Sequence, residues 1–170
     1  VTHPNQPVVR QDALSCPPSV CNLPPSLPMT HTDIHLLLTG DELMSGDTVD
    51  SNSSMIAQSL AAFGHSVAEK VTLGDDRARR IAALQRAAGS ARILIMNGGL
   101  GPTQDDLTAE LVAAAAGVKL LLHPEADKHV RDWCAARSIE PNDANLKQAW
   151  LPEGAAIIHN PRGSAVGCAI

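Results

Sequence analysis

Apolar residues follow two different spacings along the chain from residue 34 onward. Short apolar or alternating runs at residues 34–39, 65–73 and 92–96 predict buried strands. Between and after them, apolar residues recur at helical spacing and predict a helix at residues 53–63, another that ends at Ala88, and a third at residues 105–116. Strands that alternate with helices are typical of a mostly parallel sheet with helices on both faces, so the pattern predicts an α/β fold.

The remainder of the chain has shorter and weaker patterns. Pro124 is well placed at the first turn of a helix that we expect to continue to about Ser138. We also expect three brief strands, at residues 118–122, 155–158 and 165–170. A short helix is expected at residues 145–150.

Residues 1–28 differ from everything after them. Several prolines lie among Ser, Asn and Gln with no periodicity, at positions 17, 18, 24, 25 and 28. Because proline removes a backbone donor and restricts its predecessor, we expect a disordered proline-rich leader rather than a docking motif. Met29 follows directly, and a start assigned too far upstream would produce such a leader. The predicted domain therefore covers residues 29–170.

Composition excludes some classes of function. The net charge of −5 disfavours a nucleic-acid surface, which needs clustered Lys and Arg. The basic run at residues 77–80 lies in a predicted helix and is interpreted as a solvated face. The chain has 4 Cys, with no C-x-x-C pair, which is simplest in a reducing, cytoplasmic compartment. No apolar run approaches membrane-spanning length, so we expect no membrane partner.

The most informative stretch is residues 93–108, ILIMNGGLGPTQDDLT. A strand-like run leads into closely spaced glycines, which let the backbone approach a ligand and adopt positive φ. The first turn of a following helix would point its N–H groups at an anion. Asp105 and Asp106 stand at that turn, where acids either cap the helix, with Thr103 as the N-cap, or bind a cation that bridges to a phosphate.

Glycine is paired with adjacent acids in three predicted strand-to-helix loops. These are Gly40-Asp41-Glu42, Gly74-Asp75-Asp76, and the segment from Gly98, Gly99 and Gly101 through Pro102 and Thr103 to Asp106. In an open parallel sheet such loops gather beyond the carboxyl ends of the strands. Carboxylates beside free backbone N–H groups suit Mg²⁺ or a similar cation together with a phosphate ester.

Other motifs fit less well. The loop at residues 99–104 lacks the third glycine of a dinucleotide-binding G-x-G-x-x-G, and no P-loop is present. Ser164 stands one place too early for a nucleophile elbow. The seven His are scattered, and no two have metal-ligand spacing on a helix. Trp133 and Trp150 are interpreted as core or flanking residues rather than stacking platforms.

Taken together, these loops resemble the molybdopterin-binding-like fold (MoaB/MogA-like), and within it the N-terminal domain of competence/damage-inducible CinA-type proteins. The matching residues are TGDEL at 39–43, Gly46, VDSN at 49–52, GDD at 74–76, NGGLGPTQDDLT at 97–108, NLKQA at 145–149, LPEG at 151–154 and the glycine loop from 160 to 167. The resemblance implies a three-layer α/β/α domain that forms a homo-oligomer.

Two lines of activity are implied by this resemblance. CinA-type N-terminal domains look like metal-dependent pyrophosphatases (hydrolases) acting on ADP-ribose-like nucleotides. Relatives in molybdenum cofactor (MoCF) biosynthesis bind molybdopterin, which leaves a pterin- or nucleotide-binding module without turnover as the alternative. Mg²⁺ or Co²⁺ is the implied metal, with K⁺ a further option.

Residue by residue, the resemblance makes Asp75, Asp105 and Asp106 the catalytic and metal-binding acids. The residues expected to bind the phosphate or the rest of the ligand are Gly40, Asp41, Glu42, Gly98, Gly99, Gly101, Pro102 and Thr103, with Ser164 near the ligand. The family's pattern would continue past Ile170 with a strand and a Pro-Gly-rich loop, so we expect a domain truncated at its C-terminal end.

Overall fold

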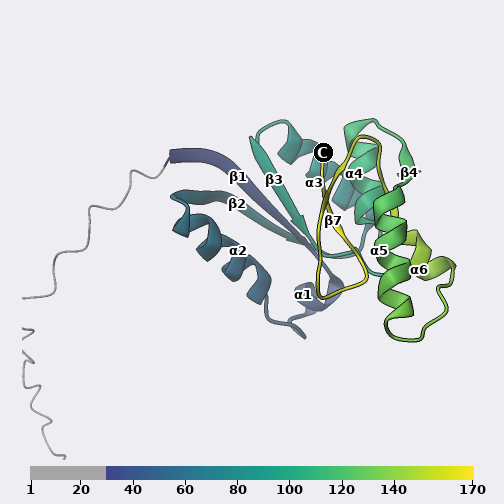
Figure 1. Cartoon of the computed structure of the whole chain (residues 1–170). Helices are drawn as coiled ribbons and strands as arrows, with labels where there is room; N and C mark the ends of the chain where they lie inside the picture. The colour runs from purple at the N-terminus through teal and green to yellow at the C-terminus, as the bar shows by residue number, and fades with distance from the viewer. Residues whose placement is uncertain (1–29) are drawn as a thin grey trace, which may run out of the picture.

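The computed structural model describes residues 30–170. The predicted leader at 1–28 therefore lies outside the described residues, as do Met29, Cys16 and Cys21. Figure 1 shows the described chain as two adjoining parts, a sheet with its helices and a smaller part that contains α5, α6 and the last strands. The elements are β1 (Thr30–Thr39), α1 (Asp41–Ser45), α2 (Ser51–Ala62), β2 (His65–Leu73), α3 (Arg77–Ala88), β3 (Ile93–Asn97), α4 (Thr108–Ala116), β4 (Leu120–Leu122), α5 (Pro124–Ala135), α6 (Asp143–Lys147), β5 (Trp150–Pro152), β6 (Ala156–Ile158) and β7 (Gly167–Ala169).

A three-stranded parallel sheet with the order β2-β1-β3 forms the larger part. Its central strand β1 is flanked on both edges, and Leu36, Leu37 and Leu38 are each only 2% exposed. Such a continuous apolar run is what a strand buried on both faces requires. The predicted fold class, α/β with a parallel sheet, is confirmed.

Helices cover both faces of this sheet. Leu37 packs with Ala83 and Leu84 of α3 and with Leu111 of α4. On the other face Lys70 of β2, whose register partner is Leu36, contacts the first turn of α2. These contacts give the α/β/α layering. Met55 of α2 and Phe63 at its C-cap are 60% and 80% exposed.

The smaller part has its own core. Ala126, Val130 and Cys134 recur every fourth residue along α5 and are fully buried against Leu151 of β5 and Val166. Its strands form two antiparallel pairs, β4-β5 and β6-β7, rather than extending the parallel sheet. Cys134 and Cys168 are free thiols.

Four predicted helices, α2, α4, α5 and α6, differ from the structure by one to three residues at one or both ends, and two of these differences concern residues near the glycine segment. The helix expected at residues 145–150 is α6, which ends at Lys147, and Trp150 instead begins strand β5. The helix expected from Asp105 begins at Thr108. No helix within residues 30–170 is long and apolar enough to cross a membrane.

Candidate functional site

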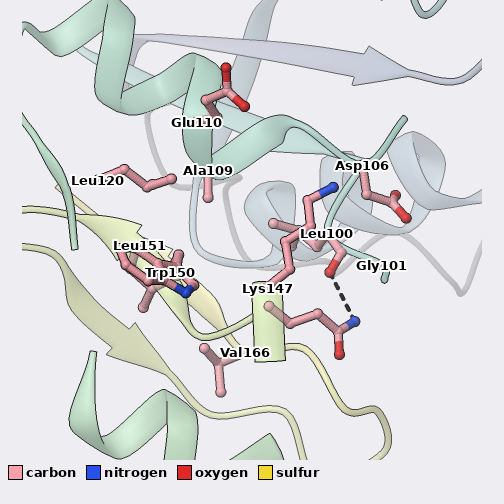
Figure 2. Close-up of a pocket in the computed structure, with 12 residues that line it drawn as sticks. Leu100, Gly101, Asp106, Ala109, Glu110, Leu120, Lys147, Trp150, Leu151 and Val166 are labelled. Atoms are coloured by element: carbon pink, nitrogen blue, oxygen red, sulfur yellow. Dashed lines mark hydrogen bonds between the residues drawn. The ribbon is translucent and has the colours of Figure 1, made fainter. Parts of the chain in front are cut away.

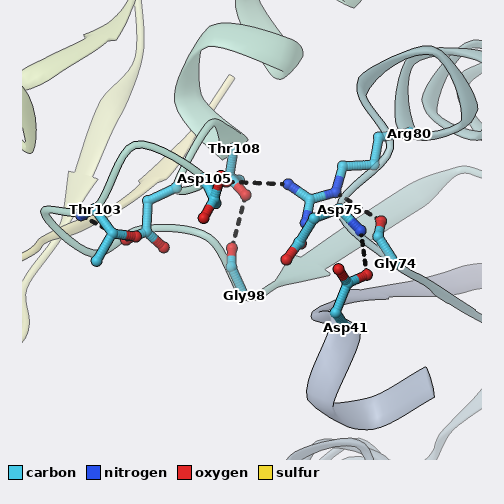
Figure 3. A network of polar contacts seen from close by, with 9 residues as sticks. Asp41, Gly74, Asp75, Arg80, Gly98, Thr103, Asp105 and Thr108 are labelled. Atoms are coloured by element: carbon cyan, nitrogen blue, oxygen red, sulfur yellow. Dashed lines mark hydrogen bonds and ion pairs between the residues drawn. The ribbon is translucent and has the colours of Figure 1, made fainter. Parts of the chain in front are cut away.

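The structure brings the three glycine- and acid-containing loops together around one side chain, Arg80 of α3 (Figure 3). Its Nε donates a hydrogen bond to the carbonyl of Gly74 at 3.0 Å, and its Nη1 donates to the carbonyl of Asp105 at 3.3 Å. Its Nη2 forms an ion pair with the carboxylate of Asp75. Arg80 therefore links the loop after β2 to the loop after β3.

Arg80 is almost completely buried, with 1% of its surface exposed. The interpretation of residues 77–80 as a solvated face is therefore wrong for Arg80. The buried residues of α3 are Arg80, Ala83, Leu84 and Ala87, which are spaced as i, i+3, i+4 and i+7. That periodicity is visible in the sequence and could have placed Arg80 on the buried face. Arg77 pairs with Glu110 of α4 at 3.0 Å.

Carboxylates surround this guanidinium. Besides Asp75, the side chains of Asp41, Glu42, Asp105 and Asp106 interact electrostatically with Arg80. Burial lowers the pKa of the Arg80 guanidinium, and the neighbouring carboxylates offset part of that effect. Five carboxylates around one guanidinium leave an excess of negative charge at this rim of the sheet.

The first loop contributes Asp41, which belongs to the short helix α1. Its carboxylate accepts a hydrogen bond from the backbone N–H of Asp75 at 2.8 Å, so the loops after β1 and β2 are joined directly. Gly74 allows this approach, because a Cβ there would clash with the Asp41 carboxylate. The predicted convergence of these loops at the carboxyl ends of the strands agrees with these contacts.

The glycine segment at residues 98–101 has the backbone conformations that glycine permits. Gly98 has a φ of 115° and packs so tightly on the end of β1 that a Cβ would clash with the carbonyl of Thr39. Thr108 fixes the segment from the other side, since its Oγ1 donates to the carbonyl of Gly98 at 2.7 Å. Among the hydrogen bonds between described residues, none is donated by the N–H of Gly99 or Leu100. Amides of a glycine-rich segment that lack a protein acceptor are the kind of donors that bind anions.

The turn at residues 103–106 explains why α4 begins late. The Asp106 carboxylate accepts hydrogen bonds from the backbone N–H of Thr103 at 2.9 Å and from its Oγ1 at 2.6 Å. This is one half of the predicted capping pair, but it closes a turn that precedes the helix. Burial raises the pKa of Asp106, yet the hydrogen bonds from Thr103 and Gly101 outweigh it and lower the pKa overall.

Two residues of the smaller part reach the same segment and were not predicted as site residues. Lys147 Nζ donates to the carbonyl of Thr103 at 2.6 Å, and Gln148 Nε2 donates to the carbonyl of Leu100 at 3.2 Å. Both residues belong to the NLKQA stretch at 145–149 that carries the family resemblance. Local spacing does not show which residues they contact, because their partners lie more than 40 residues away. Ser164 lies in the loop before β7, which contacts α5 through the carbonyl of Gly163 and the ring of His129.

The acid cluster around Arg80 has carboxylate donors of the kind that bind divalent cations. Within residues 30–170, no three His, Cys, Asp or Glu side chains gather closely enough to hold a metal ion by themselves. The chemistry of the donors nevertheless fits Mg²⁺, which proteins commonly bind through one or two carboxylates while phosphate oxygens and water complete the coordination. The excess of negative charge around Arg80 also favours a cation.

In open α/β sheets, ligands bind beyond the carboxyl ends of the parallel strands. This domain has its acids and its glycine segment at that edge, so it belongs to a ligand-binding class of α/β domains. Residues 35–168 match the model of a family described as "Probable molybdopterin binding domain", and the chain belongs to this family. The predicted resemblance is thereby confirmed.

Known relatives are CinA-like proteins. One from Colwellia psychrerythraea is 51% identical over 139 residues, which cover 82% of this chain and 32% of the relative. Another from Geobacter metallireducens is 44% identical over 132 residues, covering 78% of this chain and 32% of that protein. The chain thus spans about a third of the length of these relatives. The crystal structure of CinA from Thermoplasma acidophilum, a protein of unknown function, is similar with a TM-score of 0.73 and 28% identity, over 82% of this chain and 83% of that one.

Proposed function

We propose that this domain hydrolyses the pyrophosphate bond of ADP-ribose-like nucleotides with the help of a divalent cation. The observation that supports this most is the convergence of acids from three separate loops around Arg80, next to the free amides of Gly99 and Leu100. A diphosphate needs both features, because N–H groups stabilise its charge and carboxylates attract the cation that neutralises the rest.

In this proposal Asp75 and one of Asp105 and Asp106 would hold the cation, and phosphate oxygens and water would complete its coordination. The cation would polarise the phosphoryl group and lower the pKa of a bound water. The amides of the glycine segment bind the phosphate, and Arg80 orients the acids by fixing the loops after β2 and β3. Water adds across the P–O–P bond and yields two phosphate monoesters.

A substitution of Asp105 tests the proposal. Its side chain is exposed at the rim, while its backbone carbonyl accepts the bond from Arg80. We expect Asp105→Asn to lose most of the Mg²⁺- or Co²⁺-dependent turnover of ADP-ribose, by at least about 100-fold, without a change in melting temperature. Asp132→Asn, at an exposed position on α5, is the matched control and should keep full turnover. Full turnover of the Asp105→Asn protein would remove this acid from the mechanism.

A second candidate is a module that binds a pterin or nucleotide without turnover. The lack of a three-ligand cluster within residues 30–170 favours it, and the description of the family supports molybdopterin as its ligand. Calorimetry with ADP-ribose and with molybdopterin, each with and without metal, separates the two candidates. Tight binding without metal, never followed by product, would favour the module. We keep homo-oligomerisation as a further proposal, which sedimentation at several protein concentrations tests.

A further inference from the structure

Helix α2 lies on the outside of the sheet, away from the smaller part of the molecule (Figure 1). Its inner face packs on β2, and its outer face is exposed. The segment from Ser51 to Gly64 contains no Asp, Glu, Lys or Arg. The outer faces of α3 and α5, by contrast, carry several exposed charged residues. A surface helix normally has charged residues on the side away from the core, so α2 is an exception within this chain.

Two large apolar side chains stand on the outer face of α2. Met55 is 60% exposed and Phe63 is 80% exposed. With Ser59 and Ala62 they follow the spacing i, i+4, i+7 and i+8, which puts all four residues in one stripe. The Ser59 hydroxyl donates to the carbonyl of Met55 at 2.8 Å, so its proton already has an acceptor within the helix. We call these four residues the α2 stripe, and its contacts with a partner would be mainly apolar.

The α2 stripe is complementary to itself. Met55 and Phe63 lie four residues before and after Ser59, which is about 6 Å along the helix axis in each direction. When two α2 helices pack antiparallel about a twofold axis at Ser59, Met55 of each copy meets Phe63 of the other. Contacts between a thioether sulfur and an aromatic ring are favourable. The small Ser59 side chain at the centre lets the two helices approach closely.

The charge of the chain favours a second copy over other occupants of the stripe. Because the chain has a net charge of −5, two copies repel each other over most of their surface, and this repulsion is weakest at an uncharged face. A nucleic acid or an anionic membrane surface would require Lys or Arg at the contact, and α2 has neither.

We propose that two copies of this chain associate through the α2 stripe, antiparallel and about a twofold axis at Ser59. The inference rests on the homo-oligomerisation proposed above, for which it names the face, and it is independent of the proposed hydrolysis. Since an aromatic side chain buries about 150–250 Å², the Met55 and Phe63 side chains of two copies bury roughly 600 Å² in total. This is less than the about 1,200 Å² of stable complexes, so the dimer is weak, with a Kd on the order of 100 μM.

Charged substitutions test both the face and its orientation. Sedimentation velocity of the 170-residue chain, from about 10 μM to about 1 mM, measures the fraction of dimer. We expect Phe63→Lys and Met55→Glu each to raise the Kd of self-association by at least about tenfold. A chain with both substitutions should associate again, because the antiparallel arrangement brings position 63 of one copy against the opposite charge at position 55 of the other. This restored association should weaken at high salt.

Ile158→Lys is the matched control, because Ile158 is a 56% exposed apolar residue on β6 and not on α2. This variant should associate as the original chain does. Thermal unfolding checks that the variants are folded, which we expect because positions 55 and 63 are exposed. Met55→Glu decides alone if Phe63→Lys does not fold.

The outcomes separate the parts of the proposal. A chain that stays monomeric up to about 1 mM would overturn the dimer together with homo-oligomerisation. If the original chain associates and both single variants associate equally well, another face is used and the assignment to α2 is wrong. If the single substitutions weaken association but the pair does not restore it, the antiparallel orientation is wrong. None of these results changes the loss of turnover expected for Asp105→Asn, so failure of the dimer and failure of the hydrolysis are distinguishable.

Discussion

Arg80 is the single residue on which the geometry of the candidate site most depends. It is buried, it carries a charge, and its guanidinium contacts the backbone of two loops as well as the carboxylate of Asp75. A buried guanidinium is tolerated only when its donors have partners, and this site supplies both carbonyls and carboxylates. The same contacts mean that its removal leaves several acids without a counter-charge.

We therefore expect Arg80→Met to destabilise the fold by about 2–4 kcal/mol. The methionine would fill much of the same volume, so the loss would come from the unpaired Asp75 and the unsatisfied carbonyls of Gly74 and Asp105. Urea unfolding measures the effect. Arg79→Met, at an exposed position one residue earlier, is the control and should change stability by less than about 0.5 kcal/mol. Equal stability of the two variants would show that Arg80 does not hold the loops together.

At the scale of single elements, the starts of two helices show how local chemistry sets their bounds. Helix α2 has Asp50 as its N-cap, and the Asp50 side chain accepts a hydrogen bond from the backbone N–H of Ser53. Helix α4 has no side-chain cap, and its first residue Thr108 is instead anchored to the carbonyls of Gly98 and Gly99. The start of α4 is thus decided by its contact with the glycine segment.

The cap of α2 predicts a specific dependence of stability on pH. Hydrogen bonds from the side chain and backbone of Ser53, and then from Lys70, lower the pKa of Asp50 from 3.8 to about 2. Since the folded pKa lies below the unfolded one, the stabilisation is present above pH 3.8 and is lost as the pH falls toward 2.

Asp50→Asn tests this dependence, because asparagine also caps helices but does not titrate. We expect the original chain to lose about 1 kcal/mol more stability than the Asn variant when the pH falls from neutral to about 2.5. Urea unfolding across this range measures the difference. Parallel stability curves for the two proteins would contradict the role given to the Asp50 carboxylate.

At the scale of the whole molecule, two parts with separate cores meet at the glycine segment. Lys147 and Gln148 bridge from the smaller part to the carbonyls of Thr103 and Leu100, and a cavity of about 140 Å³ lies beside the glycine segment between the parts (Figure 2). A change at this contact should therefore alter both stability and the shape of the ligand site.

Gln148→Leu tests the bridge. Gln148 is only 8% exposed, and its substitution leaves the carbonyl of Leu100 without its donor. We expect a loss of about 1 kcal/mol, which for a chain of this size lowers the melting temperature by about 2–4 °C. Thermal unfolding followed by circular dichroism measures it. Gln58→Leu, at an exposed position on α2, is the control, and an equal shift in both variants would rule out a specific bridge.

The periodicity of apolar residues predicted the elements correctly where a pattern is compatible with only one kind of secondary structure. Strand β2 was predicted at its observed bounds. The apolar run at residues 34–39 predicted a buried strand, and the structure shows that it is the central strand β1. The spacing of Arg80, Ala83, Leu84 and Ala87 along α3 also predicts that Arg80 is buried. We instead expected the whole basic run to face solvent, because arginines are usually exposed. Periodicity gave the wrong element for Trp150, which was expected in a helix and begins strand β5. A short amphipathic stretch at the end of a helix can equally continue into a strand.

The sequence by itself determined the α/β class and the clustering of acids and glycines at one edge of a parallel sheet, because chain direction alone puts these loops at the carboxyl ends of the strands. Only the tertiary structure decided that Arg80 lies among those acids, that Lys147 and Gln148 reach the glycine segment, and that a cavity adjoins it. The physical reason is the separation of these contacts along the sequence. Hydrogen bonds between residues tens of positions apart depend on how separate elements pack, and no local pattern encodes that packing.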